Sequence, residues 1–299
     1  MELKHLGAFV ALADELHFGR AAERLCIVQP ALSMQIKTLE TGLGVRLFDR
    51  DRHKVALTDA GRLFLPEARA TLDQAARAAQ VARLSAHGEI GTLRLGFVSS
   101  VLPKLLPTVI RTLHARYPRI ALELKDMPTP DQIAALQGGT LDFGLGRLPI
   151  AAGGLRTRVV MEEPFVVAVP ASHPLARRRE IQPAQLRGQP AFVLARRYAP
   201  GLFDALLVAL GAQQVTLEIA RELGEYTTML ALVAAGLGIG LIPAEAASAV
   251  PPNVVARPLA LPGHRAPLGL IWRDDDSALK RVFVEVVEAC VNGEADEAN

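Results

Sequence analysis

The chain has 299 residues, of which 50% are hydrophobic and 5% aromatic, and its formal net charge is +2. This length suffices for two ordinary domains and a connector, with cores built chiefly from Ala, Leu and Val. So small a net charge does not by itself indicate a polyanionic partner. The two cysteines, Cys26 and Cys290, give neither metal-ligand spacing nor a disulfide framework, which suits a reducing compartment.

The first residues carry acids inside their apolar stretch, so they lack the layout of a signal peptide. No apolar run reaches the ~20 residues that are needed to span a bilayer. We therefore expect a cytoplasmic protein that has no membrane partner.

Residues 1–57 consist of short segments with helical periodicity, followed by a compact basic turn. FGRAAERL at 18–25 predicts a short helix whose two adjacent alanines would allow close helix packing. A second helix begins at Gln29 and Pro30, because proline is tolerated in a first turn, where its missing N–H would have no partner. Two helices joined by a tight turn indicate a helix-turn-helix.

The second helix divides into an apolar face and a polar face. Its inward positions are Ala31, Leu32, Ile36 and Leu39, and its outward positions are Gln29, Ser33, Met34 and Lys37. Gln can pair bidentately with adenine, Ser can contact a base or a phosphate, and Lys reaches phosphate or guanine. These outward side chains, with Pro30 at the helix start, are the predicted DNA-reading residues.

Residues 44–58, GVRLFDRDRHKVALT, place a basic tip between two short β-like pieces. The tip predicts a wing that contacts the DNA backbone through Arg50, Arg52, His53 and Lys54. Bulk charge cannot attract DNA here, since residues 1–60 hold eight Lys and Arg against eight Asp and Glu. The alternative is an ordinary three-helix module with a solvated charged loop.

Residues 58–88 form one long helical pattern that ends at Gly88. At heptad spacing its a and d positions are apolar and mostly alanine: Leu65, Ala68, Leu72, Ala75, Ala79, Ala82 and Ala86. A sustained heptad repeat favours pairing with a second helix, and we expect dimerisation through this seam. The alternative is a helix that packs on its own domain.

From Gly91 onward, short β-rich runs alternate with helical stretches, which predicts an α/β architecture. A first set, with strands 92–98, 120–126 and 141–146 and helices 101–118 and 131–139, is a βαβαβ unit with parallel strands. A second set has strands 164–170, 191–195, 214–220 and 238–243 and helices 201–210 and 225–235. Strand 266–272 and a helix over 277–291 could return to the first set.

This order predicts two lobes with a cleft between them. Lobe I would comprise about 91–162 and 266–299, and lobe II about 163–265.

Polar side chains follow the strands of the first set at their carboxyl ends: Ser99, Ser100, Thr129 and Arg147. Open α/β sheets bind ligands at this edge, and the N–H groups at a helix start favour a carboxylate. Arg147 could pair bidentately with such a carboxylate. The alternative is that Ser100 and Thr129 cap helices while Arg147 pairs with a local acid.

The stretch AAERLCIVQPALSMQIKTLETGLGVRLFDR, followed by VALTDAG, resembles the DNA-binding signature of LysR-type transcriptional regulators. The likeness covers the whole length. It implies a mainly α winged helix-turn-helix DNA-binding domain (1–57), a long linker and dimerisation helix (58–88), and a two-lobed α/β effector domain like the periplasmic binding proteins (91–299).

Within that family the chain resembles the benzoate- and muconate-responsive regulators of aromatic degradation, through RLCIVQPALSMQI, LRLGFVSSVL, DMPTPDQIAALQGGTLDFGLGRL and VAAGLGIGLIP. This likeness implies that Ser100, Thr129 and Arg147 line the effector pocket, with Pro200 and Phe203 from the second lobe. Ser99 and the helix start at Tyr226, Thr227 and Thr228 are further candidates.

The resemblance implies a ligand-responsive regulator that is not an enzyme and needs neither cofactor nor metal. Its partners would be double-stranded DNA and a small organic acid, and the protein would assemble as a dimer of dimers, a homotetramer. Two recognition helices related by a two-fold axis predict a pseudo-palindromic operator. The alternatives are a ligand-independent architectural DNA-binding protein and an α/β enzyme with an accessory winged domain.

Two positions depart from the family's usual pattern. Val28 stands where Ser or Thr is usual, and the loss of a capping hydroxyl typically costs ~1 kcal/mol. Met34 stands where Arg is frequent, so its contact with DNA would be an apolar one, for example to a thymine methyl group.

Overall fold

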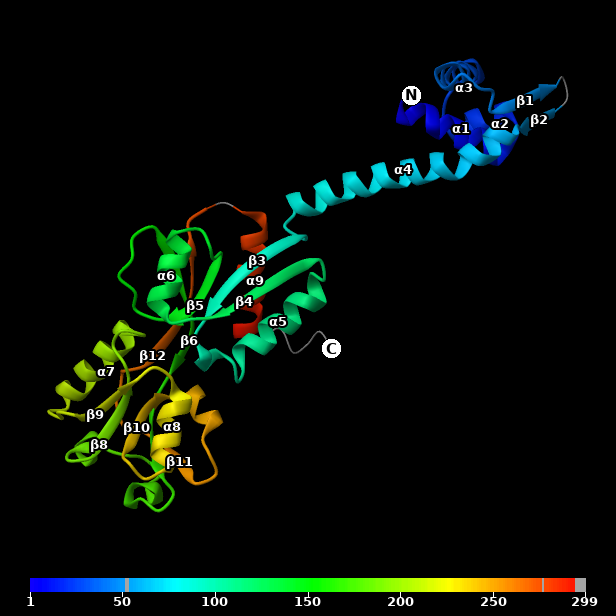
Figure 1. Cartoon of the computed structure of the whole chain (residues 1–299). Coiled ribbons are helices and arrows are strands. Elements are labelled where there is room, and N and C mark those ends of the chain that lie inside the picture. The colour runs from blue at the N-terminus through cyan, green and yellow to red at the C-terminus, as the bar shows by residue number, and fades with distance from the viewer. Residues whose placement is uncertain (52–53, 276, 294–299) are drawn as a thin grey trace. The chain divides into compact units, whose positions relative to one another are not determined.

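A computed structural model describes residues 1–51, 54–275 and 277–293 of the chain (Figure 1). The chain separates into two compact units, Met1–Leu84 and Ser85–Asn299. In the part that the structure describes, no helix combines the length and the apolar character that crossing a membrane requires.

The first unit packs its helices around the ring of Phe9. Its elements are α1 (Leu3–Glu15), α2 (Phe18–Arg24), α3 (Gln29–Leu43), the antiparallel strands β1 (Phe48–Asp51) and β2 (Lys54–Leu57), and most of α4 (Asp59–Ala86). The Phe9 ring lies 5.4 Å from that of Phe48 and 5.2 Å from that of Phe64, between ring centroids. One buried α1 side chain thus contacts both the β-hairpin and α4.

Helices α2 and α3 form the predicted helix-turn-helix. Helix α2 ends at Arg24, the turn contains Cys26 at a φ of 54°, and α3 begins at Gln29 with Pro30 in its first turn. The prediction that Pro30 marks a helix start is therefore confirmed. Val28 is the N-cap residue of α3, is 70% exposed and makes no side-chain capping bond.

The base of the predicted wing is fixed by hydrogen bonds from both sides. The Oε1 atom of Glu40 accepts from the backbone N–H groups of Leu47 at 2.9 Å and Phe48 at 3.2 Å. Thr58 Oγ1 accepts from the Gly61 N–H at 2.9 Å, which caps α4. A Cβ atom at Gly61 would lie 2.2 Å from the Leu47 carbonyl oxygen, so the close approach of α4 to the hairpin requires glycine.

The apolar seam of α4 divides into two halves with different surroundings. Leu65, Ala68 and Leu72 pack against the core of the first unit, as the alternative prediction for this helix expected. Ala79 and Ala82, farther along the same seam, are exposed. The N-terminal half of this seam therefore belongs to the core of the first unit, whereas its C-terminal half is exposed in the single chain.

The second unit contains the two-lobed α/β fold that the sequence predicted. Its first sheet runs in the order β4 (Ile120–Asp126), β3 (Gly91–Phe97), β5 (Phe143–Arg147), β12 (Ala266–Arg273) and β6 (Leu155–Glu163). Strands β3, β4 and β5 are parallel, as predicted. Strand β12 is antiparallel to both of its neighbours, so β6, which was not predicted from the sequence, runs in the same direction as β5.

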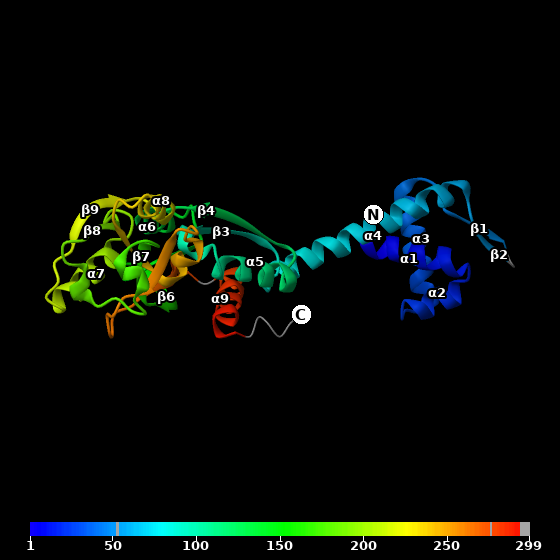
Figure 2. The ribbon, with the colours of Figure 1, turned by 90° about the horizontal axis from the view of Figure 1, so that it is seen from below.

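Helices cover both faces of the first sheet. Helices α5 (Leu105–Arg116) and α9 (Ala278–Asn292) lie side by side and share one apolar core with the sheet (Figures 1 and 2). Helix α6 (Thr129–Gln137) packs on the opposite face through Leu136. The predicted helix over 101–118 begins later than expected, because Ser99–Val101 form a 3-10 turn before α5.

The second sheet runs in the order β11 (Val254–Pro258), β7 (Phe165–Pro170), β10 (Ile239–Pro243), β8 (Pro190–Leu194) and β9 (Glu218–Leu223). It is flanked by α7 (Pro200–Ala212) and α8 (Tyr226–Ala234), and 3-10 turns lie at Pro174–Arg177, Pro183–Leu186 and Ala244–Ala249. The predicted strand over 214–220 was wrong in position. Val215 and Leu217, which suggested it, fill the core beside α7, and β9 begins only at Glu218.

The chain passes between the two sheets twice. It leaves the first sheet at Glu163, enters the second at Phe165, and returns between Pro258 and Ala266. The carboxyl ends of the parallel strands in each lobe therefore meet near these crossings, where ligand sites of open α/β sheets are found.

Candidate functional site

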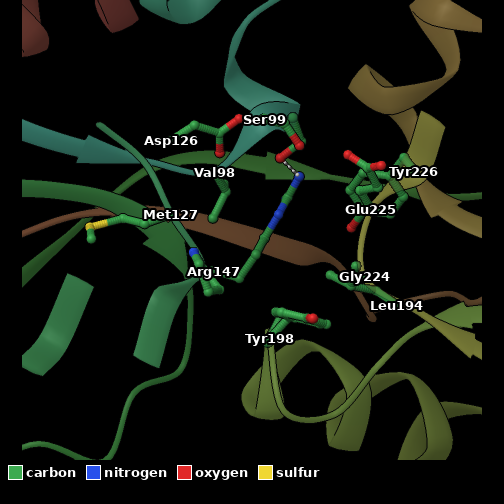
Figure 3. A pocket seen from close by; sticks show the side chains of 13 residues that line it. Val98, Ser99, Asp126, Met127, Arg147, Leu194, Tyr198, Gly224, Glu225 and Tyr226 are labelled. Carbon is green, nitrogen blue, oxygen red and sulfur yellow. Dashed lines mark hydrogen bonds between the residues drawn. The ribbon is translucent and has the colours of Figure 1, made fainter. Parts of the chain in front are cut away.

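A cavity of about 160 Å³ lies between the two lobes (Figure 3). The first lobe lines it with residues at the ends of β3, β4 and β5, and the second with residues at the ends of β8 and β9. Figure 3 shows the Arg147 side chain extending toward the turn that contains Ser99, with Asp126 on one side and Glu225 and Tyr226 on the other.

Arg147 makes a buried ion pair at the floor of this cavity. The residue is 2% exposed, and its Nη1 donates to Glu163 Oε1 at 2.9 Å while its Nη2 donates to Ser100 Oγ at 2.7 Å. Its backbone N–H donates to Thr129 Oγ1 at 3.0 Å. The second carboxylate oxygen of Glu163 accepts from the Glu245 N–H at 2.7 Å, in the turn after β10, so this network joins both lobes.

These contacts decide between the two sequence-based predictions for Arg147. Both terminal nitrogens are occupied by the protein, so they do not offer the free bidentate fork that was expected. The local acid of the alternative prediction is Glu163. The hydroxyls of Ser100 and Thr129 cap no helix, and both accept hydrogen bonds from Arg147 instead.

Two buried donors at the cavity lack hydrogen-bond partners. Among the described residues, Arg147 Nε and Tyr226 Oη are buried side-chain atoms without a partner, and both residues line the cavity. Burial raises the pKa of the Tyr226 phenol to about 12, so the phenol stays protonated at neutral pH and acts as a donor. Unpaired buried donors are costly, and both donor atoms lie beneath the surface of the cavity, so a ligand would reach them only if the two side chains shift.

Of the predicted effector residues, Ser99, Ser100, Arg147 and Tyr226 line the cavity. Five others in the described part of the chain do not: Thr129, Pro200, Phe203, Thr227 and Thr228. Thr129 is buried against the Arg147 backbone, and Phe203 packs on the core of the second lobe. Pro200 begins α7, and Thr227 is exposed on α8. The lining of this cavity therefore does not include these five residues.

The sequence did not identify Asp126, Tyr198 and Glu225, which also line the cavity. Each lies at or just after the carboxyl end of a parallel strand, so the rule that selected Ser99 and Arg147 could have found them. The misplaced strand over 214–220 hid Glu225, because β9 in fact ends at Leu223.

Asp126 and Glu225 bring negative charge to the cavity from opposite lobes. Partial burial, followed by the charge of Glu225, raises the pKa of Asp126 above its ordinary value. Thr228 Oγ1 donates to Glu225 Oε1 at 3.0 Å, which holds that carboxylate at the start of α8. Within the described residues, no group of three or more His, Cys, Asp or Glu side chains could hold a metal ion.

The outward face of α3 is a second candidate site. Gln29, Pro30, Met34 and Lys37 are exposed and Ser33 is half-buried, with Met34 at 65% exposure. Arg50 and Lys54 belong to the wing strands, whereas the predicted contacts Arg52 and His53 lie outside the described residues.

Acidic side chains of the first unit are engaged away from this face. Asp14 pairs with Arg24 at 3.0 Å and with Arg69 at 2.6 Å, and Glu15 pairs with Arg20 at 3.2 Å. Within residues 29–43, all of them described, Glu40 is the only acid, and it holds the backbone at the wing base. The exposed face of α3 thus carries Lys37 and neutral side chains, within residues 1–60 whose formal charges balance.

Two family models match the chain. A model of the bacterial regulatory helix-turn-helix proteins of the lysR family matches residues 3–62, and one of the LysR substrate binding domain matches residues 86–290. The chain is 38% identical to the Hca operon transcriptional activator HcaR of Escherichia coli strain K12 over 290 residues, or 96% of this chain and 97% of that protein.

Further relatives agree with these matches. The HTH-type transcriptional regulator BenM of Acinetobacter baylyi is 33% identical over 276 residues, or 92% of this chain and 90% of that protein. The solved structure of full-length CbnR complexed with its target DNA is similar with a TM-score of 0.85 and 27% identity, covering 97% of this chain and 100% of that one.

Breaking the buried pair should destabilise the lobe that contains it. Glu163→Gln leaves the Arg147 charge without its counter-ion, and we expect the free energy of unfolding to fall by roughly 3 kcal/mol or more. Urea unfolding of the full chain, followed through the fluorescence of the single tryptophan, Trp272 on β12, measures this loss.

The matched control is Asp204→Asn, which breaks the exposed pair between Asp204 and Arg196. Exposed pairs contribute little, so its unfolding midpoint should stay close to that of the unaltered chain. Equal midpoints for Glu163→Gln and Asp204→Asn would contradict a structural role for the buried pair.

Proposed function

The chain belongs to the LysR family of transcriptional regulators, and we propose that the cavity between its lobes senses a small organic acid. It is a ligand-responsive, DNA-binding transcriptional regulator that binds operator DNA and oligomerises. The observation that carries the proposal is that two buried residues, Arg147 and Tyr226, line the cavity and each has a side-chain donor without a partner in the protein.

The size and chemistry of the cavity both favour a small acid. Its volume of about 160 Å³ is close to the roughly 150 Å³ of a protein cavity that takes up benzene. A carboxylate that draws these two side chains toward the cavity would accept from their unpaired donors, and such charge-assisted bonds are stronger than neutral ones. The resemblance to benzoate- and muconate-responsive regulators points to the same class.

The protein would work as a regulator in the cytoplasm, without a cofactor and without turnover of its ligand. A ligand bound in the cleft would change the relative orientation of the two lobes at the crossing near Glu163. In an assembly of protomers this change would alter the contacts with DNA. The rival interpretations are a ligand-independent architectural protein and an α/β enzyme.

An acid panel tests the cleft. We expect titration calorimetry to detect binding of at least one of benzoate, cis,cis-muconate and related acids. Tyr226→Phe should weaken that binding by roughly tenfold or more, because it removes a donor to a charged group. Tyr117→Phe, which alters a half-buried tyrosine in the core of the first lobe, is the matched control and should leave the affinity unchanged.

The two rival interpretations predict different results for that panel. Absence of detectable binding for every acid would favour the ligand-independent protein. Chemical conversion of an acid, followed by chromatography, would favour the enzyme.

The exposed face of α3 would read the operator, with the wing on the backbone. Gln29→Ala should reduce the ratio of operator to scrambled-DNA affinity, since Gln can distinguish adenine by paired hydrogen bonds. Lys37→Ala should weaken binding to both DNAs and lower the salt slope by about 1, because it removes a phosphate contact.

Fluorescence anisotropy with the intergenic DNA beside the protein's own gene measures both effects. Gln74→Ala, at an exposed position of α4, is the control and should change neither. Unaltered operator discrimination in Gln29→Ala would show that α3 is not the reading helix.

The exposed half of the α4 seam would join protomers, and two such pairs would form a tetramer. Ala79→Glu places a charge in the seam and should shift the full chain toward lower mass in light scattering coupled to size-exclusion chromatography. Ala70→Glu makes the same change at an exposed position outside the seam and should keep the assembly. Intact assembly in both variants would assign the protomer contact to another surface.

A further inference from the structure

The cavity holds more negative charge than a site for a simple anion should. The charge of Arg147 is already matched by Glu163 at 2.9 Å, and the pair is buried. Asp126 and Glu225 add two carboxylates to the lining without a cation paired to them across the cavity in the described residues. A ligand that carries only a carboxylate would meet repulsion from both.

The donors and the acids come from different parts of the lining. The lining residues Arg147 and Tyr226 are 2% and 8% exposed, so they form the buried part of the lining, and each has a side-chain donor without a partner in the protein. Asp126 and Glu225 are exposed, so they belong to its open side. The cavity therefore offers donors within and acceptors toward the solvent.

We propose that the effector is an amino-carboxylate, whose carboxylate lies against Arg147 and Tyr226 and whose protonated amine lies between Asp126 and Glu225. This inference rests on the proposed function and specifies its ligand class. Because Asp126 comes from the first lobe and Glu225 from the second, the amine would join the lobes where the two carboxylates alone repel each other. The cation would thus favour the closed cleft.

The electrostatics of Asp126 agree with this arrangement. Burial and then the charge of Glu225 raise its pKa above the ordinary value, as expected for two carboxylates that line one cavity. A cation between them would remove that repulsion and give each carboxylate a charge-assisted hydrogen bond.

Matched ligand pairs that differ by an amine provide the test. The pairs are 4-(aminomethyl)benzoate with 4-ethylbenzoate, 5-aminopentanoate with hexanoate, and leucine with 4-methylpentanoate, which vary the separation of amine and carboxylate. Titration calorimetry on the full chain should show at least one amine member binding roughly tenfold or more tightly than its partner, the ratio expected of one additional charge-assisted contact.

The double variant Asp126→Asn, Glu225→Gln should remove this preference and strengthen binding of the plain acid. The control Asp131→Asn, Glu218→Gln neutralises two exposed acids that do not line the cavity and should preserve the preference.

The outcomes separate this inference from the proposed function. Plain acids that bind as tightly as their amine partners, or a preference that survives in the double variant, would overturn the amino-carboxylate while leaving an acid sensor. If neither the matched pairs nor the simple acids bind detectably, both the amino-carboxylate and the acid sensor would be overturned.

Discussion

The buried ion pair of Arg147 and Glu163 is the interaction on which the effector domain depends. Arg147 ends β5 and reaches Ser100 after β3, while Glu163 ends β6 and holds the Glu245 amide after β10. Because an unpaired charge in this position would be costly, the four elements are constrained to meet where both partners stay satisfied. Arg147 also lines the cavity, so structural support and the proposed ligand recognition share one side chain.

The parts of this domain that follow local patterns could be predicted from the sequence. Strands β3, β4 and β5 read as apolar runs between helices, and their carboxyl ends located Ser99, Ser100 and Arg147. Strand β6 could not be read in this way, because it is a largely exposed edge strand with charged residues along it. Because β6 was not predicted, the position of Glu163 in the sheet was unknown, and it could not be identified as the partner of Arg147.

The DNA-binding unit was more fully predictable, because its signals lie close together in sequence. Pro30 located the start of α3, and the basic tip located the hairpin. The division of the α4 seam into a packed half and an exposed half was not predictable in the same way. Its heptad pattern is continuous, and only the position of the Phe9 core shows that the seam is covered at Ala68 and open at Ala79.

The zero net charge of residues 1–60, which contain the helix-turn-helix and the wing, has a consequence for how the protein is distributed on a chromosome. Binding to arbitrary sequence is almost wholly electrostatic, so a module whose acids and bases balance has little attraction for bulk DNA. Fewer copies are then sequestered on the very large excess of competing sites, and more remain free to find the operator. Asp14 and Glu15 belong to this balance, and their ion pairs with Arg20, Arg24 and Arg69 also join α1 to α2 and α4.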